Sequence, residues 1–439
     1  MSDATPRRSF WSRAADALHR LVHPHYAEER ERLDSVMRKV EKAEAKQREQ
    51  LNDLRAIVTR VWDRVETQAT QRDFRGVDYR VGQLESAIGR QYHIIAKALK
   101  LAEWNEEQRV FERRLRRRLA RIASENRPVI VGPWTGEVGF ELLYWIPFVT
   151  YALHKASVSP DRILVVSRGG TAPWYSHLGG QYADILSHVT PDRFRTETMV
   201  QKKQKGMGPF DREVVRTVLK GAGVRRASLL HPGLMYPLFQ PFWKQRENVG
   251  RVEDHTAHRL LERAAVPDLR RRLPADYVAV RFYFSASFPD TPENRTFVES
   301  VVARISESTD VVLLNTGINV DDHRDFAPGQ RDRLHYVNDL MTPDGNLAVQ
   351  SAVIAGARAF VGTYGGFSYL APLYGVRSLA FYSDHDAFFA HHLDFAQRVF
   401  RRLGAASLVP LDARDADLVR LALGGVGGGV GAVTGPALR

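Results

Sequence analysis

The segment over residues 359–383 constrains the fold of this chain more tightly than any other. It alternates apolar runs with a turn of small residues, which is the pattern of a strand, a glycine turn, a helix and a second strand. Two strands joined through a helix lie parallel in one sheet, so the segment predicts a βαβ unit. The unit comprises a strand over 359–361, a turn containing Gly362, Thr363, Gly365 and Gly366, a helix over 367–374 and a strand over 377–382.

The glycine turn of this unit is a candidate ligand site. Open parallel sheets bind ligands at the carboxyl ends of their strands, where backbone N–H groups and helix N-termini point into the crevice. Gly365 and Gly366 lack the Cβ atoms that would hold a phosphate or sugar away, and Thr363 and Ser368 offer hydroxyl groups. The alternative is a tight turn without a ligand, since a lone glycine turn is weak evidence.

The same alternation of strands and helices fills the rest of the chain beyond residue 127. It predicts an α/β protein with two Rossmann-like domains, over residues 128–270 and 274–423, joined by an arginine-rich connection. Further strands are expected over 128–132, 162–167, 227–230, 277–283, 310–316 and 334–337, with one more before residue 423, and further helices over 140–155, 173–187, 211–222, 293–306, 346–356 and 387–403.

Residues 26–125 predict a different structure, a long helical region. From 26 to 124 there is no proline and there are three glycines, and apolar residues recur near heptad spacing. Such a narrow apolar stripe is buried by pairing helices, which predicts a coiled coil and a homo-oligomer. The alternative is a helical hairpin packed on the chain's own body. Residues 1–25 are basic and amphipathic or disordered, and the glycine-rich residues 424–439 predict a disordered tail.

Composition narrows the class of protein. There is no cysteine and no apolar run of the roughly 20 residues that span a bilayer, nor a signal-peptide pattern, so we expect a cytoplasmic protein. Contact of the basic N-terminus with the inner face of the membrane is a further expectation. Of the net charge of +12, residues 1–127 supply 28 − 20 = +8 on an interleaved helical pattern, and no nucleic-acid module is present, so no nucleic-acid partner is expected.

In the second α/β domain, Arg281 and Asn315 each lie near the carboxyl end of a predicted strand. They would emerge at the same sheet edge as Thr363 and Gly365. A guanidinium suits a diphosphate, because its forked donors pair with phosphate oxygens, and the asparagine could contact a base or ribose. A salt-bridged structural arginine is the alternative.

The first α/β domain has its own glycine loop, over residues 132–141. Glu137 lies in that loop as the candidate general base, and Glu141, one turn later, is its competitor. A glutamate in the first turn of a helix is also favoured by the helix dipole alone. After the next strand, Arg168, Trp174 and Tyr175 are candidate acceptor-binding residues, since aromatic faces can serve as platforms for sugars.

Metal and cofactor sites are poorly supported. Asp321, Asp322 and His323 could bind a metal, but no further ligand can be placed near them. There is no Walker-type phosphate loop and no nucleophile elbow. The sequence therefore predicts no metal site.

The two tandem α/β halves resemble the GT-B glycosyltransferases. The order of elements over residues 346–382 is similar to the donor-binding region of heptosyltransferase-like and fucosyltransferase-like members. By this resemblance, the donor nucleotide-sugar is the substrate, no bound metal or other cofactor is needed, and Arg281, Thr363, Gly365, Gly366 and Ser368 would serve the donor, beside Asn315, which is a candidate from its place at a strand end. The first domain would present the acceptor, with Glu137 as base.

Three functions remain open at this point. The first is a glycosyltransferase acting on a glycan, lipid-linked or protein acceptor. The second is a nucleotide-sugar epimerase, since such enzymes share the two-domain fold. The third is a non-catalytic coiled-coil assembly protein whose α/β body binds a sugar or nucleotide, because fold and function often separate.

Overall fold

The computed structural model describes residues 109–200, 203–264, 266, 269–318, 324–326 and 328–427, with seven separate residues nearer the N-terminus. Residues 1–101 form one compact unit and residues 102–439 another. The seven separate residues (49, 52, 53, 56, 82, 83 and 86) are helical, as the sequence predicts for them. The heptad pattern itself, the basic N-terminus, the 321–323 cluster and the tail beyond residue 427 lie outside the described residues.

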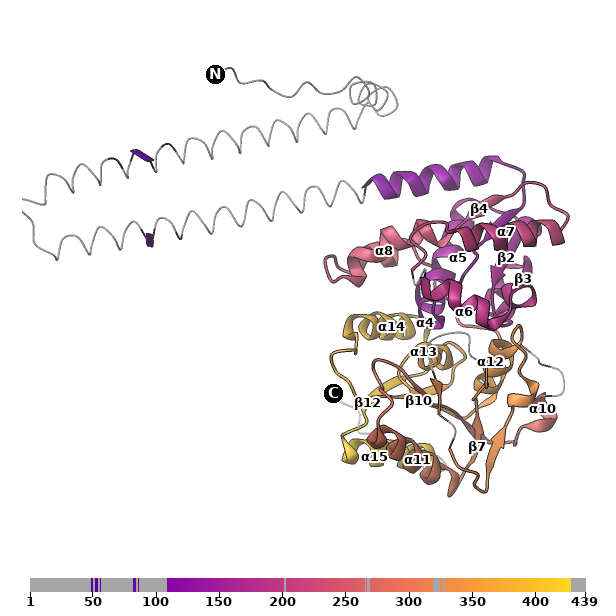
Figure 1. Ribbon diagram of the computed structural model, residues 1–439, viewed down its shortest axis with the longest axis vertical. Helices are drawn as coiled ribbons and strands as arrows, with labels where there is room; N and C mark the ends of the chain where they lie inside the picture. Colours follow the sequence, from indigo (N-terminus) through magenta and orange to yellow (C-terminus); the bar gives the residue numbers. More distant parts are fainter. Residues whose placement is uncertain are drawn as a thin grey trace, which may run out of the picture. The chain divides into compact units, whose positions relative to one another are not determined.

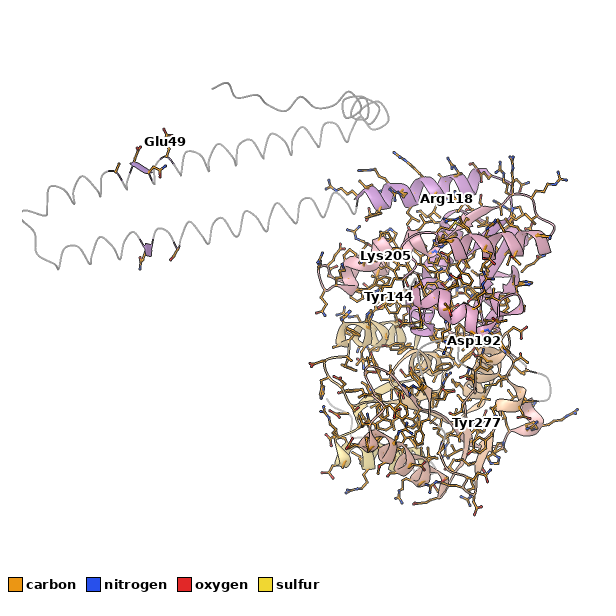
Figure 2. All side chains as sticks on the ribbon, viewed as in Figure 1. Glu49, Arg118, Tyr144, Asp192, Lys205 and Tyr277 are labelled. Carbon is orange, nitrogen blue, oxygen red and sulfur yellow. The ribbon has the colours of Figure 1, made fainter. Side chains whose placement is uncertain are left out.

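The end of the predicted helical region belongs to the α/β body. Residues 109–124 form a helix whose Leu115, Leu119 and Ile122 are buried in the core. On the same helix, the Arg118 guanidinium donates two hydrogen bonds, of 3.0 and 2.9 Å, to the carbonyl oxygen of Leu229 (Figure 2). For this stretch, the structure has a helix packed on the chain's own body, which was the alternative to a coiled coil.

The first half of the body, residues 109–264, is built on a four-stranded parallel sheet in the order β3-β2-β1-β4. Its apolar strands are covered on both faces, which explains why they read as continuous rather than alternating apolar runs. The strands are β1 (Val129–Val131), β2 (Ile163–Ser167), β3 (Gln181–Asp184) and β4 (Ser228–Leu230), and the main helices are α5 (Ile146–Lys155), α6 (Pro191–Val200), α7 (Pro209–Gly221), α8 (Met235–Trp243) and α9 (Gly250–Asp254).

One predicted helix of this half is wrong. Residues 173–187 form two 3-10 turns, η3 (Ala172–Leu178) and η4 (Ile185–Ser187), on either side of strand β3. Gly179 ends the first turn with a φ of +65°, a left-handed conformation that glycine adopts without steric cost. The glycine pair at 179–180 thus ends the helical run and lets strand β3, which was not predicted, join the sheet.

The second half, residues 269–427, contains a six-stranded parallel sheet in the order β12-β11-β10-β5-β7-β9. The parallel pairing of β10 (Ala359–Thr363) with β11 (Arg377–Tyr382) through α13 (Gly366–Leu373) confirms the βαβ unit. The other strands are β5 (Tyr277–Arg281), β7 (Asp310–Leu313), β9 (Leu334–Tyr336) and β12 (Leu408–Asp412), and β6 (Tyr283–Phe284) pairs with β8 (Arg324–Asp325) in a separate antiparallel ribbon.

Helices cover both faces of the second sheet (Figure 1). The last of them runs to Gly427, so the glycines at 424–427, predicted to be in a disordered tail, are helical. The α/β class with two parallel sheets is confirmed. The helices are α10 (Leu269–Arg272), within the predicted connection, α11 (Pro292–Ser306), α12 (Asn346–Gly356), α13, α14 (Ala390–Leu403) and α15 (Ala416–Gly427).

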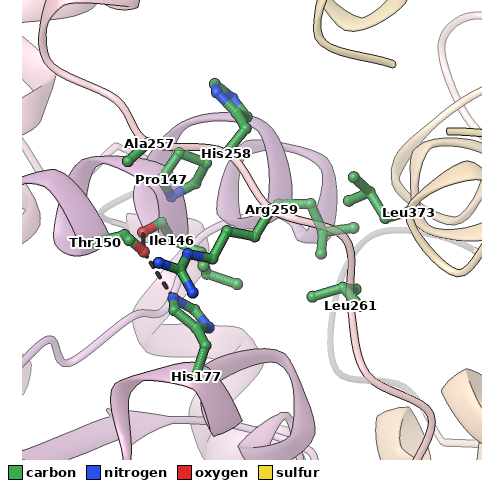
Figure 3. Close-up of a pocket in the computed structure, with 10 residues that line it drawn as sticks. Ile146, Pro147, Thr150, His177, Ala257, His258, Arg259, Leu261 and Leu373 are labelled. Atoms are coloured by element: carbon green, nitrogen blue, oxygen red, sulfur yellow. Dashed lines mark hydrogen bonds between the residues drawn. The ribbon is translucent and has the colours of Figure 1, made fainter. Parts of the chain in front are cut away.

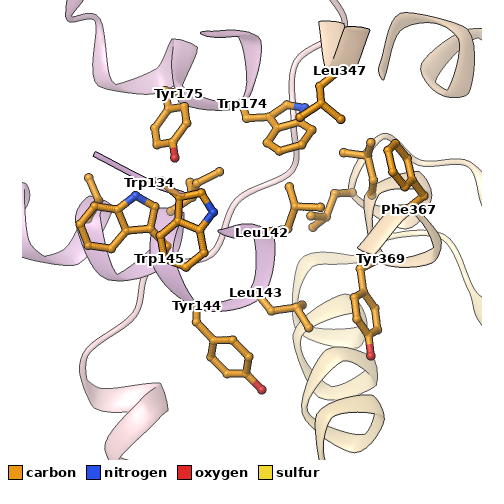
Figure 4. Packing of buried hydrophobic residues seen from close by; sticks show 14 of the residues in the cluster. Trp134, Leu142, Leu143, Tyr144, Trp145, Trp174, Tyr175, Leu347, Phe367 and Tyr369 are labelled. Atoms are coloured by element: carbon orange, nitrogen blue, oxygen red, sulfur yellow. The ribbon is translucent and has the colours of Figure 1, made fainter. Parts of the chain in front are cut away.

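The two halves meet at the carboxyl ends of their sheets and share one hydrophobic core. Figure 1 shows α4 (Val138–Phe140), α12, α13 and α14 gathered between the sheets. In Figure 4, Trp134 and Trp145 of the first half lie behind Leu142, which faces the side chains of Leu347 and Phe367 of the second. Among the described helices, none is both long enough and apolar enough to cross a membrane.

Candidate functional site

The two glycine loops of the halves touch each other. A Cβ atom on Gly366 would lie 2.7 Å from the backbone nitrogen of Gly139, and one on Gly139 would lie 3.3 Å from the Cα of Gly366. Contacts this short show that the absence of side chains at both positions permits close packing between the halves. The backbone of Leu347 also donates a 2.7 Å hydrogen bond to the carbonyl oxygen of Gly169. A ligand between these loops therefore requires the halves to part.

The hydroxyl groups predicted to bind the donor are used inside the turn. Thr363 and Ser368 have no exposed surface. The Thr363 hydroxyl donates to the carbonyl oxygen of Tyr283 at 2.8 Å and accepts from its backbone N–H at 3.0 Å. The Ser368 hydroxyl donates to the carbonyl oxygen of Gly365 at 2.7 Å. Both side chains thus hold the turn together in this conformation, in place of the ligand contacts that the sequence predicted for them.

Gly365 is also explained by the protein's own packing. The hydroxyl of Tyr283 fills the space where a Cβ of residue 365 would lie. The glycine is required there whether or not a ligand binds. Of the predicted donor residues at this turn, Gly365 and Gly366 keep their place at the carboxyl edge of β10, and their N–H groups open helix α13.

Arg281 lies where the sequence predicts it, at the carboxyl end of β5. It is 9% exposed, and its guanidinium stacks on the ring of Phe367 with 4.1 Å to the ring centroid. One Nη donates to the side-chain oxygen of Gln350 and the other lies 3.2 Å from Asp325. The Nε atom of Arg281 is buried and has no hydrogen-bond partner among the described residues.

Asn315 adds a second unpaired polar atom at this edge of the sheet. It follows β7, the neighbour of β5, and its amide nitrogen donates a 2.5 Å hydrogen bond to the carbonyl oxygen of Phe326. Its Oδ1 atom is buried and has no partner within the described part of the chain. Buried polar atoms without partners are uncommon, and they indicate a place where a water or ligand completes the bonding.

Asp325 is a residue of this site that the sequence analysis missed. It accepts from Arg281 and, at 2.8 Å, from the backbone N–H of Thr316, so one carboxylate joins the ends of β5 and β7. Its position on the short ribbon strand β8 gives no local signal in the sequence. Gln350 and Phe367 were likewise not predicted as partners of Arg281, because they reach it from α12 and α13.

Glu137 occupies an accessible position in the first half. It is exposed and forms the N-cap of α4, directly after Gly136. Its carboxylate is close enough to Tyr236 to contribute, after burial, to the raised pKa of that phenol. A general base must be reachable by the hydroxyl group that it deprotonates, and Glu137 meets that condition.

Glu141, the competing candidate base, is enclosed by the protein. It begins a π-helical turn, η1 (Glu141–Trp145), and is 0% exposed. Its carboxylate accepts hydrogen bonds from Arg168 at 2.8 Å, Ser167 at 2.6 Å and Tyr175 at 2.7 Å. Burial raises the pKa of the Glu141 carboxyl, and the Arg168 charge and the hydrogen bonds oppose that shift. No acceptor can reach this group in the present conformation.

The predicted acceptor platform is interior as well. Trp174 is 0% exposed and donates a 2.9 Å hydrogen bond from its indole nitrogen to Ser351 of α12. Tyr175 and Arg168 are buried around Glu141, and Arg168 also donates to the carbonyl oxygen of Gly136 at 2.5 Å. These residues hold the glycine loop and the contact between the halves, and they offer no exposed face to a sugar.

A small pocket lies away from these residues, beside α5 (Figure 3). Its wall is mostly apolar, and the Thr150 hydroxyl lies 2.8 Å from Nε2 of His177. Burial lowers the pKa of His177, and it lowers that of His258 to about 4. None of the sequence-predicted site residues lines it. The lining residues are Leu142, Ile146, Pro147, Thr150, His177, Ala257, His258, Arg259, Leu261 and Leu373.

Within the described part of the chain, no three His, Asp or Glu side chains gather in a way that could hold a metal ion. Asp321, Asp322 and His323 lie outside that part.

Comparison with known proteins gives structural neighbours only. No family model matches the sequence, and no curated protein does. Among solved structures, the iron-containing dodecameric glycosyltransferase TibC of enterotoxigenic E. coli is 14% identical, with a TM-score of 0.31. The chain covers 59% of TibC, and 59% of the chain is matched.

Two further solved structures are similar over part of the chain. A family 9 glycosyl transferase of Veillonella parvula is 12% identical with a TM-score of 0.36, over 68% of this chain and 90% of that one. A protein assigned as a UDP-N-acetylglucosamine 2-epimerase of Listeria monocytogenes is 11% identical with a TM-score of 0.28, over 58% and 79%. At these TM-scores, the case for a function depends on the chain's own residues.

Proposed function

We propose that the facing edges of the two sheets bind a nucleotide-sugar and that the chain transfers the sugar to a glycan, lipid-linked or protein acceptor without a metal ion. The observation that carries the proposal is Arg281, a buried guanidinium at a strand end with one unpaired nitrogen beside the N-terminus of α13. Guanidinium groups and helix N-termini both favour phosphate oxygens.

In the proposed reaction, Glu137 takes the proton of an acceptor hydroxyl. The acceptor oxygen then forms a bond to the anomeric carbon as the bond from that carbon to the diphosphate oxygen breaks. The electron pair leaves with the nucleoside diphosphate, whose negative charge Arg281 and the N–H groups at the start of α13 stabilise. Binding requires the contact between Gly139 and Gly366 to open first.

A non-catalytic body that binds a nucleotide or sugar is the second candidate function. The direct contact of the glycine loops and the internal use of the Thr363 and Ser368 hydroxyls favour it, because both features also suit a closed structural unit. A homo-oligomer formed through the predicted coiled coil before residue 109 and a location at the inner face of the membrane remain part of the proposal, since almost all the residues on which they depend are not described.

Nucleotide binding tests the donor site. We expect one nucleoside diphosphate or its sugar to raise the melting temperature, since a ligand at a hundredfold over its Kd adds about 2.7 kcal/mol to the free energy of unfolding. The shift should be lost in Arg281→Gln. The matched control is Arg358→Gln, which changes a partly buried arginine at the opposite edge of the same sheet and should keep the shift. If no nucleotide stabilises the wild-type chain, the donor site is wrong.

Turnover tests the base. With the stabilising nucleotide-sugar and candidate acceptors, Glu137→Gln should release nucleoside diphosphate about 10²–10⁴-fold more slowly while still binding the donor. Glu293→Gln, in the first turn of α11, changes a comparable glutamate and should leave the rate unchanged. Equal rates in wild type and Glu137→Gln would refute the role of Glu137. Donor isomerisation without release would identify an epimerase.

A further inference from the structure

Aromatic and imidazole side chains from both halves gather at the rim of the contact between them. We call Phe140, Trp243, Phe389, His391 and His392 the rim cluster. The Phe140 ring lies 5.0 Å from Trp243 and 5.3 Å from His392, measured between centroids. Phe389 lies 6.0 Å from each imidazole, and the two imidazoles are 4.2 Å apart. The cluster thus joins α4 and α8 of the first half to the start of α14.

The rim cluster is partly open to solvent. Phe389 is 56% exposed, and it and Tyr336 are the aromatic side chains among the exposed large hydrophobic residues of the described chain. The other four members are half-buried. Nε2 of His391 is buried and has no hydrogen-bond partner among the described residues. Core packing alone requires neither an exposed phenyl ring nor an unpaired imidazole nitrogen.

The rim cluster lies next to the proposed base. Glu137 is the N-cap of the short helix α4, and Phe140 is the last residue of that helix. Tyr236, on which the charge of Glu137 acts, has its ring 5.2 Å from that of Trp243. An acceptor bound on the cluster would therefore have a hydroxyl group within reach of Glu137.

We propose that the rim cluster binds a sugar ring of the acceptor, which makes the acceptor a carbohydrate. This inference rests on the proposed function. It gives the rim cluster the acceptor-binding role that the sequence predicted for Trp174 and Tyr175. A sugar ring presents a face of C–H groups that packs on aromatic rings and a rim of hydroxyls, one of which would be the group that Glu137 deprotonates. An acyl chain has no hydroxyl group for Glu137 to deprotonate, which disfavours a lipid tail as occupant.

The test is the binding of the full chain to a microarray of neutral and acidic oligosaccharides, with and without the stabilising nucleoside diphosphate. We expect binding of at least one class of oligosaccharide, reduced tenfold or more in Phe389→Ala. Phe389→Leu keeps an apolar side chain but removes the ring face, and it should lose binding as well. Tyr336→Ala removes a comparably exposed aromatic ring on β9 and should bind as the wild type does.

The outcomes separate this inference from the proposed function. If nucleotide stabilises the chain but no oligosaccharide binds, or if Phe389→Ala binds as the wild type does, the inference is overturned while the donor site stands. If Phe389→Leu keeps full binding, the surface recognises apolar groups and the sugar assignment is wrong. If Phe389→Ala instead loses the nucleotide-induced stabilisation, the rim cluster stacks on the donor base and the inference is also wrong.

Discussion

Replacing Glu141 by alanine is expected to lower the free energy of unfolding by about 3–5 kcal/mol, the cost of leaving a buried charge without its partner. Arg168 is 7% exposed, and its Nη1 donates to Glu141 at 2.8 Å. Without the carboxylate, this guanidinium stays buried, and the hydroxyl groups of Ser167 and Tyr175 lose their acceptor as well. The loss should appear as a lower urea midpoint with an unchanged m-value.

Two controls isolate the buried pair. Glu137→Ala, an exposed glutamate in the same loop, should change the free energy of unfolding by no more than about 0.5 kcal/mol. The double variant Glu141→Leu with Arg168→Met removes both charges and should recover much of the loss, because replacing a buried pair by apolar groups is often close to neutral. If Glu141→Ala is as stable as the wild type, the Glu141–Arg168 pair makes no net contribution to the free energy of unfolding.

The two glutamates show where sequence reasoning reached its limit. Both Glu137 and Glu141 follow a glycine loop after a strand, and a regular helix would place residues four apart on one face. The backbone N–H of Glu141 does bond to the carbonyl oxygen of Glu137 at 3.0 Å, as in a regular helical turn, but Glu137 is the N-cap of α4 and has an extended backbone, and its side chain is exposed while that of Glu141 is buried. The residue at which the extended backbone ends and the helix begins decides this outcome, and the local sequence does not fix that boundary.

The strands of both sheets could be predicted because short local runs of apolar residues mark them in the sequence. Runs such as Tyr277–Val280 and Ala359–Val361 are apolar, short and bounded by glycine or charged residues, so strand and helix alternate visibly along the chain. The function of the glycines could not be predicted in the same way. Gly365 and Gly366 suit a phosphate-binding loop, yet the atoms nearest to them belong to Tyr283 and Gly139, which are distant in sequence.

The polar partners of Arg281 were hidden for the same reason. Its position at a strand end follows from the local pattern, but Gln350, Asp325 and Phe367 come from three other elements. The rim cluster combines α4, α8 and α14, which are about 100 and 250 residues apart along the chain. Sites assembled from several elements need the tertiary fold, whereas a site on one turn can be recognised in the sequence.

Acid is expected to destabilise the protein through two largely buried histidines. Burial lowers the pKa of His258 to about 4 and that of His392 to about 3, against about 6.5 in an unfolded chain. Above pH 6.5 both are neutral in both states, and their full contribution to stability is present. As the pH falls below 6.5, the unfolded chain binds protons that the folded chain does not bind, so the free energy of unfolding decreases. At pH 5 the two together should cost about 4 kcal/mol relative to pH 7.5.

The measurement is the free energy of unfolding by urea between pH 8 and pH 5. Each of His258→Gln and His392→Gln should reduce the slope by about 1.4 kcal/mol per pH unit below pH 6, and the exposed His154→Gln should not change it. A slope unaltered in both variants would contradict the assignment.

The acid effect should begin where the two halves meet. Nδ1 of His392 lies 2.6 Å from the Tyr144 hydroxyl across the contact, with His391 and Lys203 as the nearby cations. His258 lies 2.9 Å from the carbonyl oxygen of Leu143 and packs on Phe395 of α14. Protonation of either histidine places a charge among these aromatic side chains. The contact that must open for a ligand to enter is therefore also the one that acid weakens.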